Sequence, residues 1–254
     1  EEESIRLSAQ GTYRLLDIIR FANVKATFFV TGLFTSRCPD LVKEIIDLGN
    51  EVASHGLRHY PPNSETLSDK LRSFEESEDI IKRATGEKPL GYREPCLKIG
   101  RETIEALKRL RYVYDSSILP TWVPGRYNRL RVRTAPFLWG SGLGQLVEIP
   151  VSVTPLLRIP VGWWWFRKNF GLRICKMGFE SIWKLCLPVI CHIHSWELVD
   201  LPKMPSVPIH IRFNCGAESD TQTRELIAYA KSSGARFSTM INLAERFLLR
   251  LKKA

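Results

Sequence analysis

Apolar positions along the chain alternate between short continuous runs and helical spacings. Residues 24–30, VKATFFV, are rich in β-branched and aromatic residues and are soon followed by Gly32, which is typical of a buried strand. In residues 12–22 before this run and residues 39–50 after it, apolar side chains recur every three or four positions, which places them on one face of a helix. The pattern predicts a helix, a strand and a second helix.

The same alternation continues over nearly the whole chain. Further strands are predicted at residues 51–54, 90–93, 112–118, 146–153, 187–194 and 235–240, and further helices at residues 64–86, 100–110, 221–234 and 241–253. Strands that alternate with helices favour a parallel sheet, either open or closed into a barrel. We therefore expect an α/β fold in which residues 1–254 form a single domain.

Residues 120–187 interrupt this alternation. Four aromatic residues at 163–166 stand directly before Arg167 and Lys168. Charged residues cut the segment too often for it to span a bilayer. It is predicted to be an aromatic and basic insertion that either packs over the sheet as a roof or contacts lipid headgroups at a membrane surface.

Charge and cysteine usage narrow the classes of partner and compartment. The 37 Lys and Arg exceed the 27 Asp and Glu by 10, a surplus that attracts phosphate, anionic polysaccharide or an anionic membrane surface. These cations are scattered without a recognisable nucleic-acid module, so no nucleic-acid partner is expected. The six cysteines form no CxxC pair, which favours free thiols in the cytoplasm or on the cytoplasmic face of a membrane, with an extracytoplasmic location as the alternative.

Polar clusters follow several of the predicted strands: SHGLRH, REP, DSS and HSWE. Loops at the carboxyl ends of parallel strands converge on one mouth, so these clusters are candidates for one site. His55 and His59 are four residues apart, a spacing that can bind one metal ion. Gly56 stands where the metalloprotease motif HExxH has its glutamate, so that motif is excluded, and two solvated loop histidines are the alternative.

Five ordered motifs, KATFFVTG, EVASHGLRH, GYREP, YDSS and HIHSWEL, resemble those of the polysaccharide deacetylase family, which has the NodB homology domain and is carbohydrate esterase family 4. The resemblance implies a distorted (β/α) barrel of about seven parallel strands. It also implies a hydrolase that removes the N-acetyl group from an N-acetylhexosamine unit of a glycan or glycolipid. The implied cofactor is a divalent metal, most often zinc, with cobalt or nickel as alternatives, and the implied partner is an N-acetylated glycan or a lipid-linked sugar.

The resemblance assigns roles to individual residues. His55 and His59 match the metal-ligand pair, and His194 matches the general acid. Arg93 and Pro95 match the motif whose arginine holds the catalytic carboxylate. His192 is expected to point away from the site.

Amide hydrolysis needs a proton for the departing amine, and an imidazole such as that of His194 titrates near the working pH. Either Asp115 or Glu197 is expected to orient this imidazole, with Asp115 as a further catalytic residue. Trp196 offers a flat apolar face on which a sugar ring can stack. The residues expected to line the substrate site are Tyr92, Pro95, Trp196 and Glu197.

One motif of the family has no counterpart in this sequence. The family's first strand ends in the catalytic-base aspartate and an acidic metal ligand, and no such strand precedes residue 24. The resemblance therefore implies that the first strand is truncated, with the aspartate upstream of Glu1. Glu1, Glu2 and Glu3 are either the tail of that motif or a solvated acidic end of the chain.

Three rival functions follow from these observations. The missing aspartate is compatible with a catalytically degenerate barrel that binds glycan without hydrolysing it. The same motifs suit a related deformylase or cyclic-amide hydrolase. The basic surplus alone suits a surface adaptor that binds no metal.

Overall fold

The computed structural model describes residues 1–59, 65–140, 144–201 and 207–253. The chain forms two compact units. The first, called here the sheet unit, comprises Lys25–Ile118, Ala135–Pro150 and Ser238–Ala254. The second, called the helical unit, comprises Glu1–Val24, Leu119–Thr134 and Val151–Phe237. That residues 1–254 are a single domain stays a prediction.

The sheet unit contains a six-stranded sheet with the order β1-β2-β3-β4-β8-β7. Its strands are β1 (Thr27–Val30), β2 (Glu51–Ser54), β3 (Gly91–Tyr92), β4 (Tyr114–Asp115), β8 (Leu146–Glu148) and β7 (Phe137–Trp139). The first five run parallel to their neighbours, and β7 pairs antiparallel with β8. The α/β class is confirmed. The mostly parallel sheet expected for a distorted barrel is present, with six strands among the described residues and no closure detected between β1 and β7.

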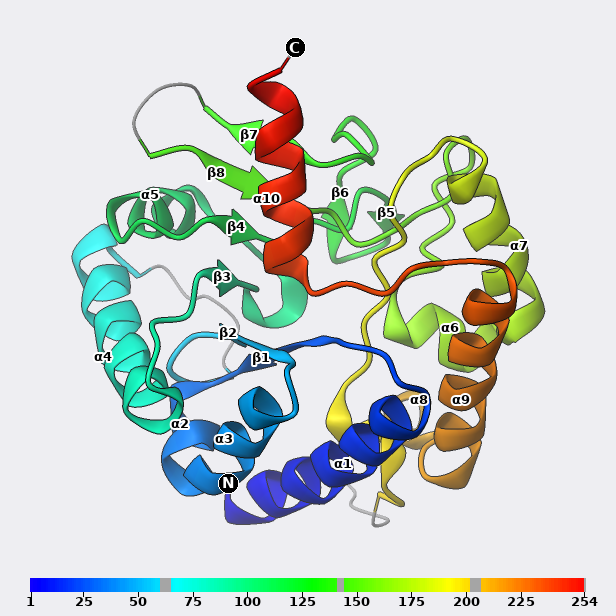
Figure 1. Ribbon diagram of the computed structural model, residues 1–254, viewed down its shortest axis with the longest axis horizontal. Helices are drawn as coiled ribbons and strands as arrows, with labels where there is room; N and C mark the ends of the chain where they lie inside the picture. Colours follow the sequence, from blue (N-terminus) through cyan, green and yellow to red (C-terminus); the bar gives the residue numbers. More distant parts are fainter. Residues whose placement is uncertain (60–64, 141–143, 202–206, 254) are drawn as a thin grey trace. The chain divides into compact units, whose positions relative to one another are not determined.

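Helices cover this sheet. They are α2 (Gly32–Arg37), α3 (Pro39–Asp47), α4 (Leu67–Thr85), the short 3₁₀ helix η1 (Pro95–Leu97), α5 (Arg101–Arg109) and α10 (Met240–Leu251). Figure 1 shows α3, α4 and α5 around the outer side of β1–β4. Thr66 and Asp69 form a reciprocal capping box at the start of α4, and Gly86 ends the helix with φ +84°. These local signals fix where α4 begins and ends.

The sheet needs a glycine at one position. A Cβ atom on Gly91 would lie 2.0 Å from Cζ of Tyr114, the neighbouring residue on β4. Only a residue without a side chain allows β3 and β4 to pair here while the Tyr114 ring stays buried. This close contact fixes the register that places Arg93 and Asp115 at the carboxyl ends of their strands.

The helical unit contains a two-stranded hairpin and a set of helices. Its elements are α1 (Glu2–Phe21), β5 (Trp122–Val123), β6 (Tyr127–Asn128), α6 (Trp164–Phe170), α7 (Leu172–Trp183), the 3₁₀ helix η2 (Ser195–Leu198), α8 (Ile209–Arg212) and α9 (Ala217–Ser232). Helix α1 packs against η2, and a Cβ atom on Gly11 would lie 1.9 Å from the carbonyl oxygen of Ser195. This contact fixes the segment that carries His194.

Two predicted strands are absent from the described sheets. In residues 187–194, Ile190 N donates to the hydroxyl of Ser152 at 2.7 Å, and Ser152 N donates to the carbonyl of Ile190 at 3.0 Å. A side-chain oxygen thus takes the place of a strand carbonyl, so the segment is extended but joins no ladder. Residues 235–240 lead into α10, where Met240 N donates to the Thr27 hydroxyl at 2.8 Å.

Candidate functional site

The loop after β2 carries His55 and His59. Its start is fixed by His55 N, which donates to the carbonyl of Val30 at 2.7 Å. Gly56 has φ +79°, and its carbonyl accepts a hydrogen bond from the hydroxyl of Ser77 on α4 at 3.1 Å. The half-buried His55 and the exposed His59 are therefore held on an ordered turn at the carboxyl end of the strand.

The ring of His55 is oriented by the backbone. Its Nδ1 lies 2.5 Å from the carbonyl oxygen of Arg93. Since a carbonyl can only accept, Nδ1 carries a proton, which in the neutral ring leaves the lone pair on Nε2. The ring of His59 lies beside it, with centroids 5.0 Å apart and planes at 56°. A metal-binding histidine commonly donates its second ring nitrogen to a backbone carbonyl in this way.

The residues present fit part of a divalent-metal site. Two adjacent imidazoles, one with its tautomer set, are suitable ligands for zinc, cobalt or nickel. In the part of the chain that the structure describes, no group of three or more His, Cys, Asp or Glu residues is arranged to hold an ion. The described residues thus bring two candidate ligands together.

The acidic residues at positions 1–3 belong to the start of α1. All three are exposed, and Glu3 pairs with Arg6 at 2.6 Å. The hydrogen bond from Arg6 lowers the pKa of the Glu3 carboxyl. A solvated helix start is one of the two alternatives predicted for these residues, and their service as metal ligands stays a prediction.

Arg93 is buried and tightly held. Its Nε donates to the carbonyl of Ser116 at 2.8 Å, and a terminal nitrogen donates to the Ser116 hydroxyl at 2.7 Å. Its guanidinium lies 4.3 Å from the centre of the Phe29 ring. These contacts fix the backbone of Arg93, whose carbonyl orients His55. The expected role of its side chain, to hold a catalytic carboxylate, stays a prediction.

Two residues with strained backbone conformations lie shortly after Arg93 in the chain. Pro95 begins η1, and the next two residues, Cys96 and Leu97, have φ values of +59° and +56°. Residues with side chains rarely adopt this left-handed conformation, and such positions cluster at functional sites. Pro95 itself is buried. Its expected contact with substrate stays a prediction.

Tyr92 has a core position. Only 1% of its surface is exposed, and its ring packs against Phe74 and Tyr112 at centroid distances of 4.8 and 6.1 Å. Burial is the main cause that raises the pKa of its phenol, well above the ordinary value. The expected substrate contact of Tyr92 stays a prediction, and we do not carry it into the proposed site.

Asp115 belongs to a buried pair of carboxyl groups. It is the register neighbour of Glu148 across β4 and β8, and both side chains are fully buried. Asp115 accepts a hydrogen bond from the Ser117 hydroxyl at 2.5 Å, and Glu148 accepts one from Ile118 N at 3.0 Å. Burial raises the pKa of both carboxyls, and the charge of Asp115 raises that of Glu148 further. The pair therefore keeps a proton to higher pH than two separate solvated carboxyls would, and catalysis by Asp115 stays a prediction.

We expect Glu148→Gln to flatten the pH dependence of stability above about pH 5. A carboxyl whose folded pKa is raised contributes its full stability below the unfolded pKa and loses it as pH rises through the folded value. The amide removes this loss. The measurement is the free energy of unfolding between pH 5 and 8 for both proteins. Parallel curves would show that the pair does not retain a proton.

His194 lies in a second cluster, in the helical unit. Its backbone N–H donates to Glu197 Oε1 at 2.6 Å, and its ring Nδ1 lies 3.3 Å from the same oxygen. The ring of Trp196 stacks on the imidazole at 5.0 Å and 18°, and Trp164 meets it edge-on at 5.0 Å. The side chain of His194 keeps 28% of its surface exposed. The imidazole is thus held on several sides and still reaches solvent.

His192 does not point away from His194 as expected. The two rings lie 5.7 Å apart at 84°. That expectation was wrong because residues two apart in an extended segment lie on the same side of the chain.

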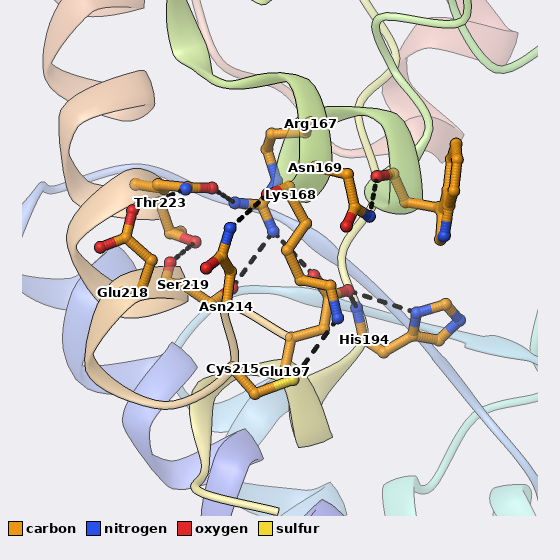
Figure 2. A network of polar contacts seen from close by, with 12 residues as sticks. Arg167, Lys168, Asn169, His194, Glu197, Asn214, Cys215, Glu218, Ser219 and Thr223 are labelled. Atoms are coloured by element: carbon orange, nitrogen blue, oxygen red, sulfur yellow. Dashed lines mark hydrogen bonds and ion pairs between the residues drawn. The ribbon is translucent and has the colours of Figure 1, made fainter. Parts of the chain in front are cut away.

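Glu197 joins His194 to a buried arginine. Its carboxylate is 0% exposed, and Oε2 accepts a hydrogen bond from Arg167 at 2.8 Å. Figure 2 shows this network, which continues from Arg167 to α9. Burial raises the pKa of Glu197, but the hydrogen bond from His194 and the charge of Arg167 outweigh it and leave the pKa below its ordinary value. Glu197 is therefore an ionised carboxylate.

Of the two acids predicted to orient His194, the structure places Glu197 in contact with it. Asp115 instead contacts Ser117, as described above. Both oxygens of Glu197 already accept hydrogen bonds from protein donors. Its expected contact with substrate stays a prediction.

The segment of four aromatic residues forms the start of α6 and the residue before it. Arg167 and Lys168, which follow them, are buried, and Lys168 lies over the rings of Trp164 and Trp196 at 5.0 and 5.4 Å. These two cations face the protein, as a packed insertion requires, and present no charge to lipid headgroups. None of the described helices has the length and apolar character needed to cross a bilayer.

Two family models match the chain. The model described as polysaccharide deacetylase matches residues 6–114, and the model described as a domain of unknown function (DUF3473) matches residues 116–245. The first covers the histidine loop and Arg93, the second covers Glu148 and the His194 network, and Asp115 lies between the two matches. The boundary thus falls within β4.

Curated relatives and a solved structure are similar to the chain. A peptidoglycan deacetylase-like protein of Gibberella zeae is 33% identical over 116 residues, 42% of this chain and 32% of its own. A peptidoglycan deacetylase of Helicobacter pylori is 31% identical over 161 residues, 61% of this chain and 53% of its own. The chain thus spans about a third and about half of the length of these relatives.

The fold has solved counterparts. A protein from Mycobacterium smegmatis that is assigned as a polysaccharide deacetylase has a crystal structure that superposes on this chain with a TM-score of 0.71. It is 21% identical, and the match covers 97% of this chain and 79% of that one. At this identity the likeness concerns the fold. By the sequence matches, residues 6–114 are a polysaccharide deacetylase domain, and the chain belongs to the family described as a domain of unknown function (DUF3473), whose model matches residues 116–245.

Proposed function

We propose that the protein to which this chain belongs is a metal-dependent hydrolase that removes the N-acetyl group from an N-acetylhexosamine unit of a glycan. The observation that carries the proposal is the oriented histidine pair. His55 donates Nδ1–H to the carbonyl of Arg93 and thereby directs the Nε2 lone pair away from the backbone, beside His59. The names of the curated relatives favour peptidoglycan as the glycan.

In this proposal His55 and His59 hold a divalent metal. Imidazole nitrogen suits zinc best, with cobalt and nickel as alternatives. When bound, the ion polarises the attacking water and the acetyl carbonyl. Every assay of this proposal uses the full-length protein.

His194 supplies the proton that the leaving amine requires. In the imidazolium form Nδ1–H is donated to the carboxylate of Glu197, so the proton on Nε2 is the one transferred, which leaves the neutral ring with its proton on Nδ1. The stacked ring of Trp196 holds the plane of the imidazole. Stacking of a sugar ring on Trp196 remains a further proposal.

We expect the purified protein to bind about one divalent metal ion per chain and the double variant His55→Ala, His59→Ala to bind none. The two imidazoles are the ligands that the described residues offer. Metal content is measured by mass spectrometry after dialysis. His192→Ala serves as the control and should keep the metal. Retention of metal by the double variant would refute this pair as the site, and a metal-free wild type would support the adaptor alternative.

The identity of the reaction product distinguishes the proposed function from the remaining alternatives. Wild-type protein is incubated with an N-acetylated glycan, an N-formylated sugar and a cyclic amide, and acetate, formate and ring-opened product are quantified. The proposal predicts acetate alone. Formate or ring-opened product without acetate would support a related amide hydrolase, and binding of glycan without any product would support a degenerate barrel.

A further inference from the structure

The buried arginine behind Glu197 has a specific arrangement of donors. Arg167 is 1% exposed and comes from α6, in the segment between the strands of the sheet and the histidine motif. One terminal nitrogen donates to Glu197 Oε2 at 2.8 Å and lies 3.3 Å from the Ser219 hydroxyl. The other donates to Gln222 Oε1 at 3.1 Å. The guanidinium thus bridges η2 and α9 (Figure 2).

The two oxygens of the Glu197 carboxylate have different partners. Oε1 faces the backbone and ring of His194, and Oε2 faces Arg167. A planar carboxylate that is held at one oxygen by a planar guanidinium cannot rotate at the other oxygen without losing that bond. The orientation of His194 therefore depends on a side chain that does not touch it.

Further contacts hold the arginine in turn. Gln222 donates from its amide nitrogen to Glu218 Oε1 at 2.8 Å, which fixes the amide so that its oxygen faces Arg167. The chain of contacts runs from α9 through the arginine and the carboxylate to the imidazole. Because the hydrogen bonds of Arg167 to Glu197 and Gln222 are buried, water does not replace these two partners.

We propose that Arg167 is a positioning residue for His194 that acts through Glu197. The inference deepens the proposed function and rests on it for the catalytic part, since His194 is the general acid there. Arg167 holds Glu197 in place, so that Nδ1 of His194 keeps its proton and Nε2 is the nitrogen that gains and loses one. The DUF3473 half of the chain thereby sets the tautomer of the general acid.

A structural role alone predicts a different result from a positioning role. If Arg167 only stabilised the fold, a folded variant would keep the ring of His194 in its native tautomer. If Arg167 positions the ring, a folded variant loses the preference for the Nδ1–H tautomer. The ¹⁵N chemical shifts of the two ring nitrogens report this directly, without any substrate.

The test compares full-length wild type, Arg167→Met, Arg167→Lys and the control Arg224→Met. Arg224 lies on α9 and forms an exposed ion pair with Asp220 at 2.6 Å, so its loss should leave His194 unchanged. Lysine keeps the buried charge and so keeps the fold, but it lacks the planar fork that joins Glu197 to Gln222. If Arg167→Met does not fold, Arg167→Lys tests whether Arg167 positions His194.

We expect the neutral ring of His194 to be mainly Nδ1–H in wild type and in Arg224→Met, and mixed in Arg167→Met. In the deacetylation assay, kcat should fall about 10- to 100-fold in Arg167→Met while KM changes less than about 2-fold. Arg167→Lys should recover part of kcat. A folded Arg167→Met or Arg167→Lys with the wild-type tautomer and kcat would overturn the proposal.

The two proposals fail in distinguishable ways. If wild type releases no acetate, the proposed function fails, and the ring ¹⁵N shifts still decide whether Arg167 positions His194. If wild type is active and the variants keep both tautomer and kcat, the proposed function stands and the role of Arg167 is structural.

Discussion

Replacement of His194 by alanine is expected to lower kcat for deacetylation by about 10²- to 10⁴-fold, the usual contribution of a positioned general acid. Without the imidazole, position 194 has no N–H to donate to Glu197 and no proton to give to the departing amine. KM should change little, because the proton is needed only as the amine leaves. The measurement is the steady-state rate of acetate release at saturating substrate.

Loss of the fold would not explain this result. The side chain of His194 is partly exposed, and its removal opens no core cavity. The midpoint of thermal unfolding should therefore stay within a few degrees of wild type. A variant that is equally stable and retains a kcat within about 3-fold of wild type would remove His194 from the mechanism.

Arg167→Met is expected to destabilise the protein by about 3–5 kcal/mol, because it leaves the charge of Glu197 buried without its partner. The two side chains are 1% and 0% exposed. The double variant Arg167→Met, Glu197→Gln removes both charges and should destabilise the protein less than Arg167→Met alone. The free energy of unfolding is measured by denaturant titration at neutral pH.

The Arg167–Glu197 pair also makes the stability of the protein depend on pH in the acidic range. Since the pKa of Glu197 is lower in the folded protein than in the unfolded chain, its contribution is present above the unfolded pKa and is lost as pH falls through the folded value. The difference in the free energy of unfolding between wild type and the double variant should therefore shrink as pH falls through the folded pKa of Glu197. An exposed control, Arg224→Met, should cost no more than about 0.5 kcal/mol. An equal cost for Arg167→Met would contradict the buried-pair account.

Local patterns predicted much of the sheet unit. EVAS forms β2 over the predicted residues, and VKATFFV contains β1. The spacing of His55 and His59 after a strand predicted two adjacent rings, because a short turn at a strand end keeps such residues together. By contrast, the sequence of residues 187–194 cannot reveal that Ser152 will take the place of a strand partner.

The partners of the site carboxylates could not be predicted from spacing. Glu197 meets Arg167 across 30 residues, and Asp115 meets Glu148 through the register of two very short strands. Such pairs depend on tertiary packing, which no local period encodes. One signal was available for Arg167, since a cation that directly follows four aromatic residues is drawn inward when those residues pack.

The proposed deacetylase activity is measured as acetate release from an N-acetylated peptidoglycan fragment by the full-length protein. We expect equal amounts of acetate and free amine, loss of both when the metal is chelated, and recovery when zinc is restored. Glycan binding without acetate, or release that chelation does not change, would contradict the proposal.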